Sequence, residues 1–266
     1  MTSVCKAVLE AFNATEVEYK VNLTRKAARE WFSGNLSFEF NASPPQRPGR
    51  PDKPELIAPQ DMPRRRNAKA RAARIAMLHA IAHIELNAID LALDIVVRFG
   101  ADMPKEFTDD WIKVADDEAR HFSMLNNLLI EFDSFYGAMP AHDGLWQSAS
   151  TTSHDLLARL AIVPLVLEAR GLDVTPAMIK KFQAADDQKS VKALEIIYQE
   201  EIDHVRAGIK WFEYLCIKRN INSEQAYHNL VNQYFTGKLK PPFNIEARNQ
   251  AGLGEKFYMP LIQQNN

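Results

Sequence analysis

Residues 115–122 read ADDEARHF and place Glu118 three residues before His121. In an α-helix, side chains three residues apart lie on the same face, so these two can point in one direction. A single Glu-x-x-His sequence arises often by chance, and acidic residues beside a lone His are common on solvated helix faces. The pair is therefore either part of a polar surface or half of a metal site, and the rest of the chain decides between the two.

The same motif recurs 83 residues later, in the stretch YQEEIDHV, as Glu201 and His204. A lone glutamate precedes the first Glu of each motif by 33 residues: Glu85 precedes Glu118, and Glu168 precedes Glu201. Identical spacing in both halves of the chain indicates an internal repeat of two helix pairs.

The region from about residue 64 to 219 has an almost continuous helical pattern and lacks the alternation that strands need. Long amphipathic helices are predicted at 66–99, 108–136, 154–185 and 187–219. Pro164, Gly171 and Pro176 predict a kink or break in the third helix. Four such helices predict an all-α fold built on a four-helix bundle.

The flanking segments predict extensions packed on this bundle. Residues 1–65 are expected to form N-terminal helices over 4–33 and a proline-rich extended arm over 42–63. The bundle itself is assigned to 66–219. Residues 220–266 are expected to form a C-terminal extension, whose tail, 236–266, is expected to be irregular because it is rich in Pro, Gly and Asn. The whole chain is expected to form a single compact unit.

All six repeated Glu and His side chains fall on apolar helix faces. Glu118 and His121, for example, lie at helical spacing between Val114 and Leu125. A buried carboxylate must be paired, protonated or bound to a metal, and no Lys or Arg shares these faces. Six oxygen and imidazole donors without a thiolate satisfy two divalent cations, and they suit iron or manganese.

This ligand set resembles that of the ferritin-like di-iron/di-manganese carboxylate superfamily over about residues 66–219. The stretches HAIAHIELNAIDLALD, DDEARHF, PGRPDKPELIAPQDMPRRR and PPFNIEARNQAGL resemble a bacterial ferritin-like branch carried as a domain of unknown function. The resemblance implies two metal ions, with Fe/Fe first and Fe/Mn or Mn/Mn as alternatives. The implied ligands are Glu85, Glu118, His121, Glu168, Glu201 and His204.

Five neighbouring residues carry weaker hypotheses, each with a structural alternative. Tyr198, one turn before Glu201, is a candidate catalytic phenol or a core tyrosine with a satisfied hydroxyl. Asp117 and Asp203 could accept the outer N–H of a ligand imidazole or lie on a solvated surface. His83 could support the site or bond between helices. Arg170 could neutralise a carboxylate or form a surface salt bridge.

The ligand set favours an oxidoreductase that activates O₂ at a two-metal centre and hydroxylates or oxidises a small organic substrate. About 110 residues outside the bundle favour this reading, because they could roof a substrate pocket. A ferroxidase or iron-handling protein is the alternative, and a non-catalytic binding protein with a relic site is the second. An electron-donor protein and a homodimer remain open as partners.

Composition excludes several other classes. The chain has 46% apolar and 25% charged residues and a net charge of −2, so no overall field favours nucleic acid. The basic run RRRNAKARAAR is interpreted as the solvated start of a helix rather than a polyanion site. Two cysteines without a CxxC fit a reducing cytoplasm, and neither a signal peptide nor a membrane span is expected.

Overall fold

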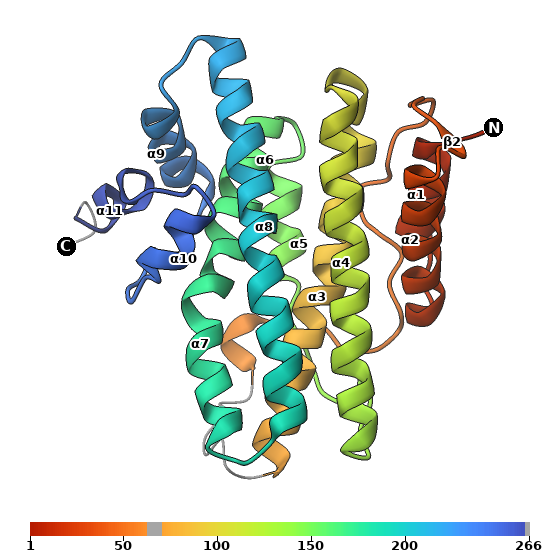
Figure 1. The fold of residues 1–266 in the computed structure, drawn as a ribbon, viewed down its shortest axis with the longest axis vertical. Coiled ribbons are helices and arrows are strands. Elements are labelled where there is room, and N and C mark those ends of the chain that lie inside the picture. Colours follow the sequence, from red (N-terminus) through yellow and green to blue (C-terminus); the bar gives the residue numbers. More distant parts are fainter. Residues whose placement is uncertain (63–70, 264–266) are drawn as a thin grey trace. The chain divides into compact units, whose positions relative to one another are not determined.

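The computed structural model describes residues 1–62 and 71–263, and this part of the chain is predominantly helical (Figure 1). The predicted all-α class is thereby confirmed. The chain divides into two compact units: Met1–Trp146 with Ala184–Ala193, and Gln147–Gln183 with Leu194–Asn266. The four-helix bundle and its boundaries at 66 and 219 stay predictions.

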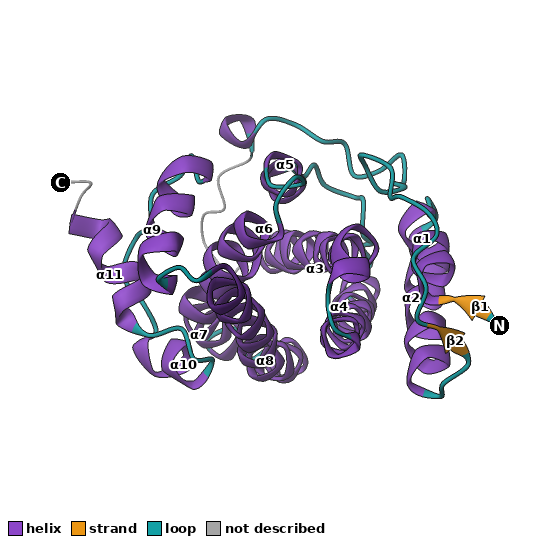
Figure 2. Cartoon of the chain, turned by 90° about the horizontal axis from the view of Figure 1, so that it is seen from above, coloured by secondary structure: helices purple, strands orange, loops and turns teal. Residues whose placement is uncertain are grey.

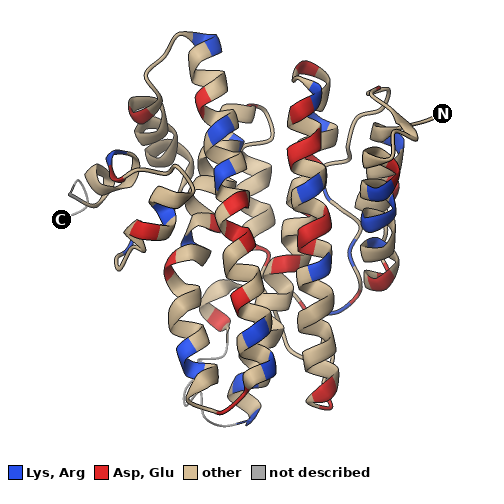
Figure 3. Ribbon diagram, in the orientation of Figure 1, with Lys and Arg blue, Asp and Glu red and all other residues tan. Residues whose placement is uncertain are grey.

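The described part of the first unit is built around four α-helices, α1 to α4, and a small parallel strand pair. Its elements are β1 Thr2–Ser3, α1 Val4–Asn13, α2 Val17–Phe32, β2 Leu36–Ser37, η1 Pro59–Asp61, α3 Arg71–Phe99, η2 Gly100–Asp102 and α4 Lys105–Glu131. Helix α4 packs against α3 on one side and α2 on the other (Figure 2). Charges of both signs alternate along α4 (Figure 3), which fits the nearly neutral net charge.

Two predicted N-terminal features are confirmed. The helical stretch 4–33 forms α1 and α2, and the Ser3 side chain caps α1 by accepting a hydrogen bond from the backbone N–H of Lys6. Apart from the short 3₁₀ turn η1, the described part of the proline-rich arm has no helix. Its Gly49 lies so close to α1 that an added Cβ would be 2.2 Å from the carbonyl oxygen of Asn13.

The predicted ends of the first two bundle helices are partly corrected. Helix α3 ends at Phe99 as predicted, whereas its expected start at residue 66 lies outside the described residues, as do residues 64–70 of the basic run 64–74, whose last four residues begin α3. Helix α4 begins directly after Pro104 rather than at residue 108. It ends before residue 136 because Asp133 adopts a left-handed conformation (φ 50°) through which an α-helix does not continue.

The second unit contains the predicted third helix, most of the fourth, and the C-terminal segment. Its elements are α5 Gly144–Thr151, which starts in the first unit, α6 Leu156–Ile162, η3 Val163–Glu168, α7 Ala169–Gln183, α8 Gln188–Arg219, which also starts in the first unit, α9 Ser223–Tyr234, α10 Ile245–Gln250 and α11 Glu255–Gln263. Helix α8 matches the predicted span 187–219 to within one residue at its start.

The predicted break in the third helix is confirmed at Pro164 and has a specific form. Between α6 and α7 the chain makes a π-helical segment, η3, which ends on Glu168. Pro164 has no backbone N–H and cannot make the ordinary helical hydrogen bond, so the ladder is interrupted there. The helix nevertheless continues through Gly171 and Pro176 within α7.

Gly208 of α8 packs directly on the ring of Pro164. An added Cβ would lie 2.5 Å from Pro164 Cβ and 2.8 Å from Cγ, and a proline ring cannot rotate away. We therefore expect Gly208→Ala to lower the free energy of unfolding by about 1–3 kcal/mol. Gly171→Ala is the matched control, since an added Cβ there meets nothing within 4 Å. It should stabilise α7 by about 0.5–1 kcal/mol in urea unfolding. Equal effects of the two substitutions would contradict this packing.

The expectation of an irregular tail over 236–266 is wrong for Ile245–Gln250 and Glu255–Gln263, which form α10 and α11, and Ser223–Tyr234 before it forms α9. Asparagine side chains cap two of these helices. The side chain of Asn222 caps α9 by accepting from Gln225 N–H, and that of Asn244 caps α10 by accepting from Ala247 N–H. Gly252, with φ 87°, lies just beyond α10.

Candidate metal centre

A buried cluster of carboxylates and an imidazole that can hold a metal ion lies between α3 and α4. Glu85 comes from α3, and Glu118 and His121 come from adjacent turns of α4. His121 Nδ1 lies 3.2 Å from Glu85 Oε2 and 3.4 Å from Glu118 Oε2. These three residues, called the first half-site below, offer ligand atoms within 4.8 Å of one another.

The sequence places the first half-site in the interior because its residues fall on core-facing stripes. On α4, Trp111, Val114 and Leu125 are buried at helical spacing around Glu118 and His121. Glu118 and His121 are themselves fully buried. The apolar environment therefore follows directly from the spacing of three or four residues between the apolar side chains on α4.

Electrostatics in the first half-site favour a cation. Burial raises the pKa of Glu85 well above its ordinary value, and the negative charge of Glu118 raises that pKa further. The hydrogen bond with His121 acts in the opposite direction. A divalent ion among these donors would offset both the burial and the repulsion between the carboxylates, so the residues present fit a metal.

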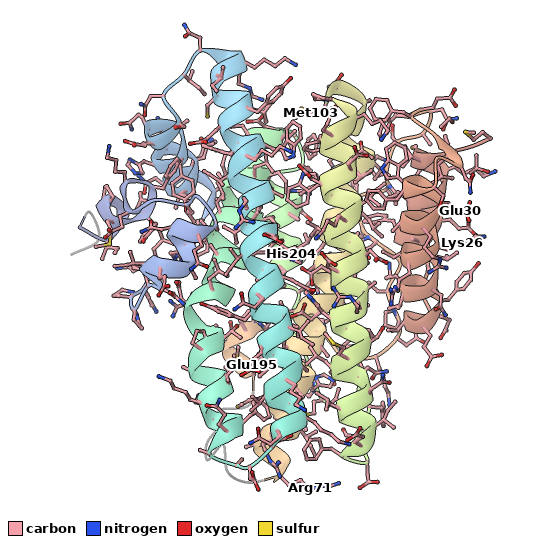
Figure 4. The ribbon with its side chains drawn as sticks, viewed as in Figure 1. Lys26, Glu30, Arg71, Met103, Glu195 and His204 are labelled. Atoms are coloured by element: carbon pink, nitrogen blue, oxygen red, sulfur yellow. The ribbon has the colours of Figure 1, made fainter. Side chains whose placement is uncertain are left out.

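The second unit carries the same three residue types in the same order. Glu168 ends η3, and Glu201 and His204 lie on α8, with His204 about midway along that helix (Figure 4). His204 Nδ1 lies 3.6 Å from Glu201 Oε2. Glu201 Oε2 is buried and has no hydrogen-bond partner within the described residues. We call Glu168, Glu201 and His204 the second half-site.

His83 is engaged on another side of α3. Its Nδ1 lies 2.8 Å from the hydroxyl of Tyr136, and its Nε2 lies 3.1 Å from the carbonyl oxygen of His142. Burial is the main reason that the pKa of His83 is lowered to about 4, which keeps its imidazole neutral. These contacts favour the interpretation of His83 as a residue that ties α3 to the loop after α4.

Two further candidates have partners that favour their structural alternatives. Asp203 is half exposed and pairs with Arg206 on the same helix. Arg170 donates to the carbonyl oxygens of Lys240 (2.7 Å) and Pro242 (3.3 Å), so it holds the segment before α10. These contacts favour a surface role for Asp203 and a packing role for Arg170 over support of a metal ligand.

The last two candidates remain hypotheses with new structural context. Asp117 forms ion pairs with Lys113 (2.8 Å) and Arg120 (2.9 Å) on α4. The Tyr198 hydroxyl accepts a hydrogen bond of 2.8 Å from the side-chain amide of Asn244. A phenol held in this way matches the alternative of a packed tyrosine with a satisfied hydroxyl.

A buried ion-pair network on α3, five residues after Glu85, was not predicted from the sequence. Lys20 Nζ lies 2.6 Å from Asp90 Oδ1, and both side chains are almost fully buried. Arg50 from the proline-rich arm approaches the other carboxylate oxygen at 3.5 Å. The available signal was Asp90 itself, an acidic residue within the apolar run of α3.

Comparison with known proteins gives a family but no activity. A family model described as "Protein of unknown function (DUF455)" matches residues 13–259, which include both half-sites. An uncharacterized protein of Haemophilus influenzae is 43% identical over 208 residues, covering 76% of this chain and 72% of the relative. No solved structure matches the chain. None of the described helices combines the length and apolarity of a membrane span.

Proposed function

The chain belongs to the DUF455 family, and we propose that it is a di-metal oxidoreductase that uses O₂ to hydroxylate or otherwise oxidise a small organic substrate. The observation that carries this proposal is the buried first half-site, in which two carboxylates and an imidazole lie within 4.8 Å of one another. The second half-site would supply an equal set of donors. Together the two half-sites would hold two ions.

The burial of the first half-site favours a site that binds a metal over a polar cluster that binds none. Glu85, Glu118 and His121 are at most 3% exposed. Keeping two carboxylates charged in such a place costs several kcal/mol per ion unless a counter-charge is present. The described Lys20 and Arg50 are used by Asp90, so these cations serve another carboxylate.

The donor types support iron or manganese. Carboxylate oxygens and imidazole nitrogens without thiolates suit both metals, and the preference for Fe/Fe over Fe/Mn or Mn/Mn comes from the resemblance to ferritin-like proteins. A glutamate with a Glu-x-x-His motif in each half-site gives six donors, which leave coordination positions for other ligands.

When bound, a two-iron centre supplies redox chemistry with O₂, which no side chain of this protein can supply. The protein's own residues would bind the metal ions and keep water away from them. Glu85, Glu118 and His121 would hold one ion, and apolar side chains such as Trp111 and Val114 exclude water from the first half-site. An apolar lining that excludes water protects reactive intermediates from side reactions. An electron-donor protein would be required for turnover.

The function is tested by O₂ consumption. Protein loaded anaerobically with ferrous iron should consume O₂ on mixing with aerated buffer. His204→Ala should slow this at least about tenfold, because removal of a metal-site residue weakens the centre. His228→Ala on α9, a partly exposed histidine that contacts the Lys256 carbonyl, should leave the rate unchanged.

The same experiment separates the alternatives. With excess reductant, an oxygenase should continue beyond one turnover when a suitable organic compound is added, and mass spectrometry should detect the added oxygen atom. Consumption that stops once the iron is oxidised would favour the ferroxidase alternative. An absence of O₂ consumption in iron-loaded protein would favour the relic site and contradict the proposal.

A further inference from the structure

The segment that carries Glu168 has an unusual backbone. In η3 the N–H of Ala169 donates to the carbonyl oxygens of Pro164, five residues back, and Val166, three residues back, and so passes over the carbonyl of Leu165. An α-helix would pair residue 169 with residue 165. Such π-helical turns are rare, and they occur often at functional sites. Two contacts from outside η3 lie at this turn.

One of these contacts comes from the C-terminal segment. The hydroxyl of Tyr227, on α9, donates a hydrogen bond of 3.1 Å to the carbonyl oxygen of Leu165. The Tyr227 ring is fully buried, with edge contacts to Phe212 and Phe257. The Tyr227 hydroxyl therefore gives a hydrogen bond to the Leu165 carbonyl oxygen, which does not receive one from Ala169 in the widened turn.

A second contact from the same segment holds the other side of Glu168. Arg248 of α10 is buried, and its Nη2 lies 3.4 Å from the carbonyl oxygen of Ala169. An ion pair of 2.8 Å with Asp173 fixes the guanidinium, which also lies over the rings of Phe243 and Tyr258. Arg248 thus fastens α7 directly after the turn.

We propose that Tyr227 is a positioning residue for Glu168, acting through the Leu165 carbonyl, and that the C-terminal segment serves to hold this ligand in place. Contacts at Leu165 and Ala169 bracket Glu168 in the chain. A π-helical turn holds about one residue more than an α-helical turn. If η3 relaxed to a regular α-helix, Glu168 would therefore rotate by roughly 100° around the helix axis relative to one flank. The inference rests on the proposed function, since it concerns the second half-site.

The test uses Co²⁺ as the probe and three single variants. Tyr227→Phe removes only the hydroxyl that contacts Leu165. Tyr258→Phe is the matched control, because it removes a buried hydroxyl of the same C-terminal segment that has no hydrogen bond within the described residues. Glu168→Gln gives the visible spectrum of a centre that lacks the carboxylate itself.

Titration of the unmodified protein should show two bound Co²⁺ ions per chain. Tyr227→Phe should weaken one of them by roughly fivefold or more, the ratio that corresponds to one hydrogen bond of about 1 kcal/mol. Its visible spectrum should shift toward that of Glu168→Gln. Tyr258→Phe should match the unmodified protein in both affinity and spectrum.

Thermal unfolding of the metal-free variants separates positioning from simple stability. If Tyr227→Phe unfolds earlier yet binds Co²⁺ with unchanged affinity and spectrum, the hydroxyl only stabilises the fold and the inference is overturned, while the proposed function stands. If the unmodified protein binds no Co²⁺, both the inference and the proposed function fail.

Discussion

Glu118→Gln should raise the unfolding temperature of the metal-free protein and lower that of the metal-loaded protein. Glu118 is fully buried, and its charge helps to raise the pKa of neighbouring Glu85, so without an ion the pair either repels or must take up a proton, and both cost folding free energy. The amide keeps the shape and removes one charge, which should stabilise the metal-free fold by about 1–2 kcal/mol. A bound metal reverses the order, because it stabilises the unmodified protein by about 2.7 kcal/mol at a hundred times Kd.

The measurement is thermal unfolding followed by circular dichroism, first with a chelator and then with Mn²⁺ or anaerobic Fe²⁺. Glu106→Gln is the control, since Glu106 is an exposed residue of the same helix, α4. It should leave both unfolding temperatures unchanged. An equal gain on metal addition in Glu118→Gln and in the unmodified protein would show that Glu118 is no ligand.

Asp90→Ala should lower the free energy of unfolding by about 3–5 kcal/mol, because it leaves Lys20 charged and buried without its carboxylate. Burial raises the pKa of Asp90 despite the nearby charges of Lys20 and Arg50. Desolvation therefore outweighs the attraction within this network. We infer that the network fixes the positions of α2 and the proline-rich arm on α3 more than it adds stability.

Urea unfolding measures this effect, and two comparisons define it. Glu131→Ala breaks an exposed ion pair with Lys189 and should change the stability by no more than about 0.5–1 kcal/mol. Combining Asp90→Leu with Lys20→Met should recover much of the loss, since a well-packed apolar pair can replace a buried ion pair. A loss below about 1 kcal/mol in Asp90→Ala would mean that Lys20 is readily solvated.

The features that could be predicted from the sequence are those that depend on local periodicity. Glu85, Glu118 and His121 were identified because helical spacing fixes the face on which a side chain lies, and the structure brings these three together. The all-α class and the break at Pro164 follow from the same local rules. Glu168 could be placed on a core-facing line, but the widened turn beneath it could not be foreseen.

The features that the sequence did not reveal depend on distant partners. Lys20 lies 70 residues from Asp90, and Tyr227 lies 62 residues from Leu165. Nothing near either residue indicates the contact, because only the tertiary fold brings the partners together. The last two helices were missed for a different reason: the Asn content of the tail, which includes Asn244, was interpreted as a sign of irregular structure, although the same residue is a favourable helix cap.

The most direct test of the central claim is the metal content of aerobically purified protein by elemental mass spectrometry. The Glu118→Ala, Glu201→Ala double variant is compared with a matched Glu106→Ala, Glu195→Ala variant, which changes exposed glutamates of the same two helices, α4 and α8. About two ions of iron or manganese per chain in the unmodified and matched proteins, lost in the double variant, is the expected result. No metal in any of them after anaerobic reconstitution with ferrous iron, or equal metal in all, would contradict the proposed centre.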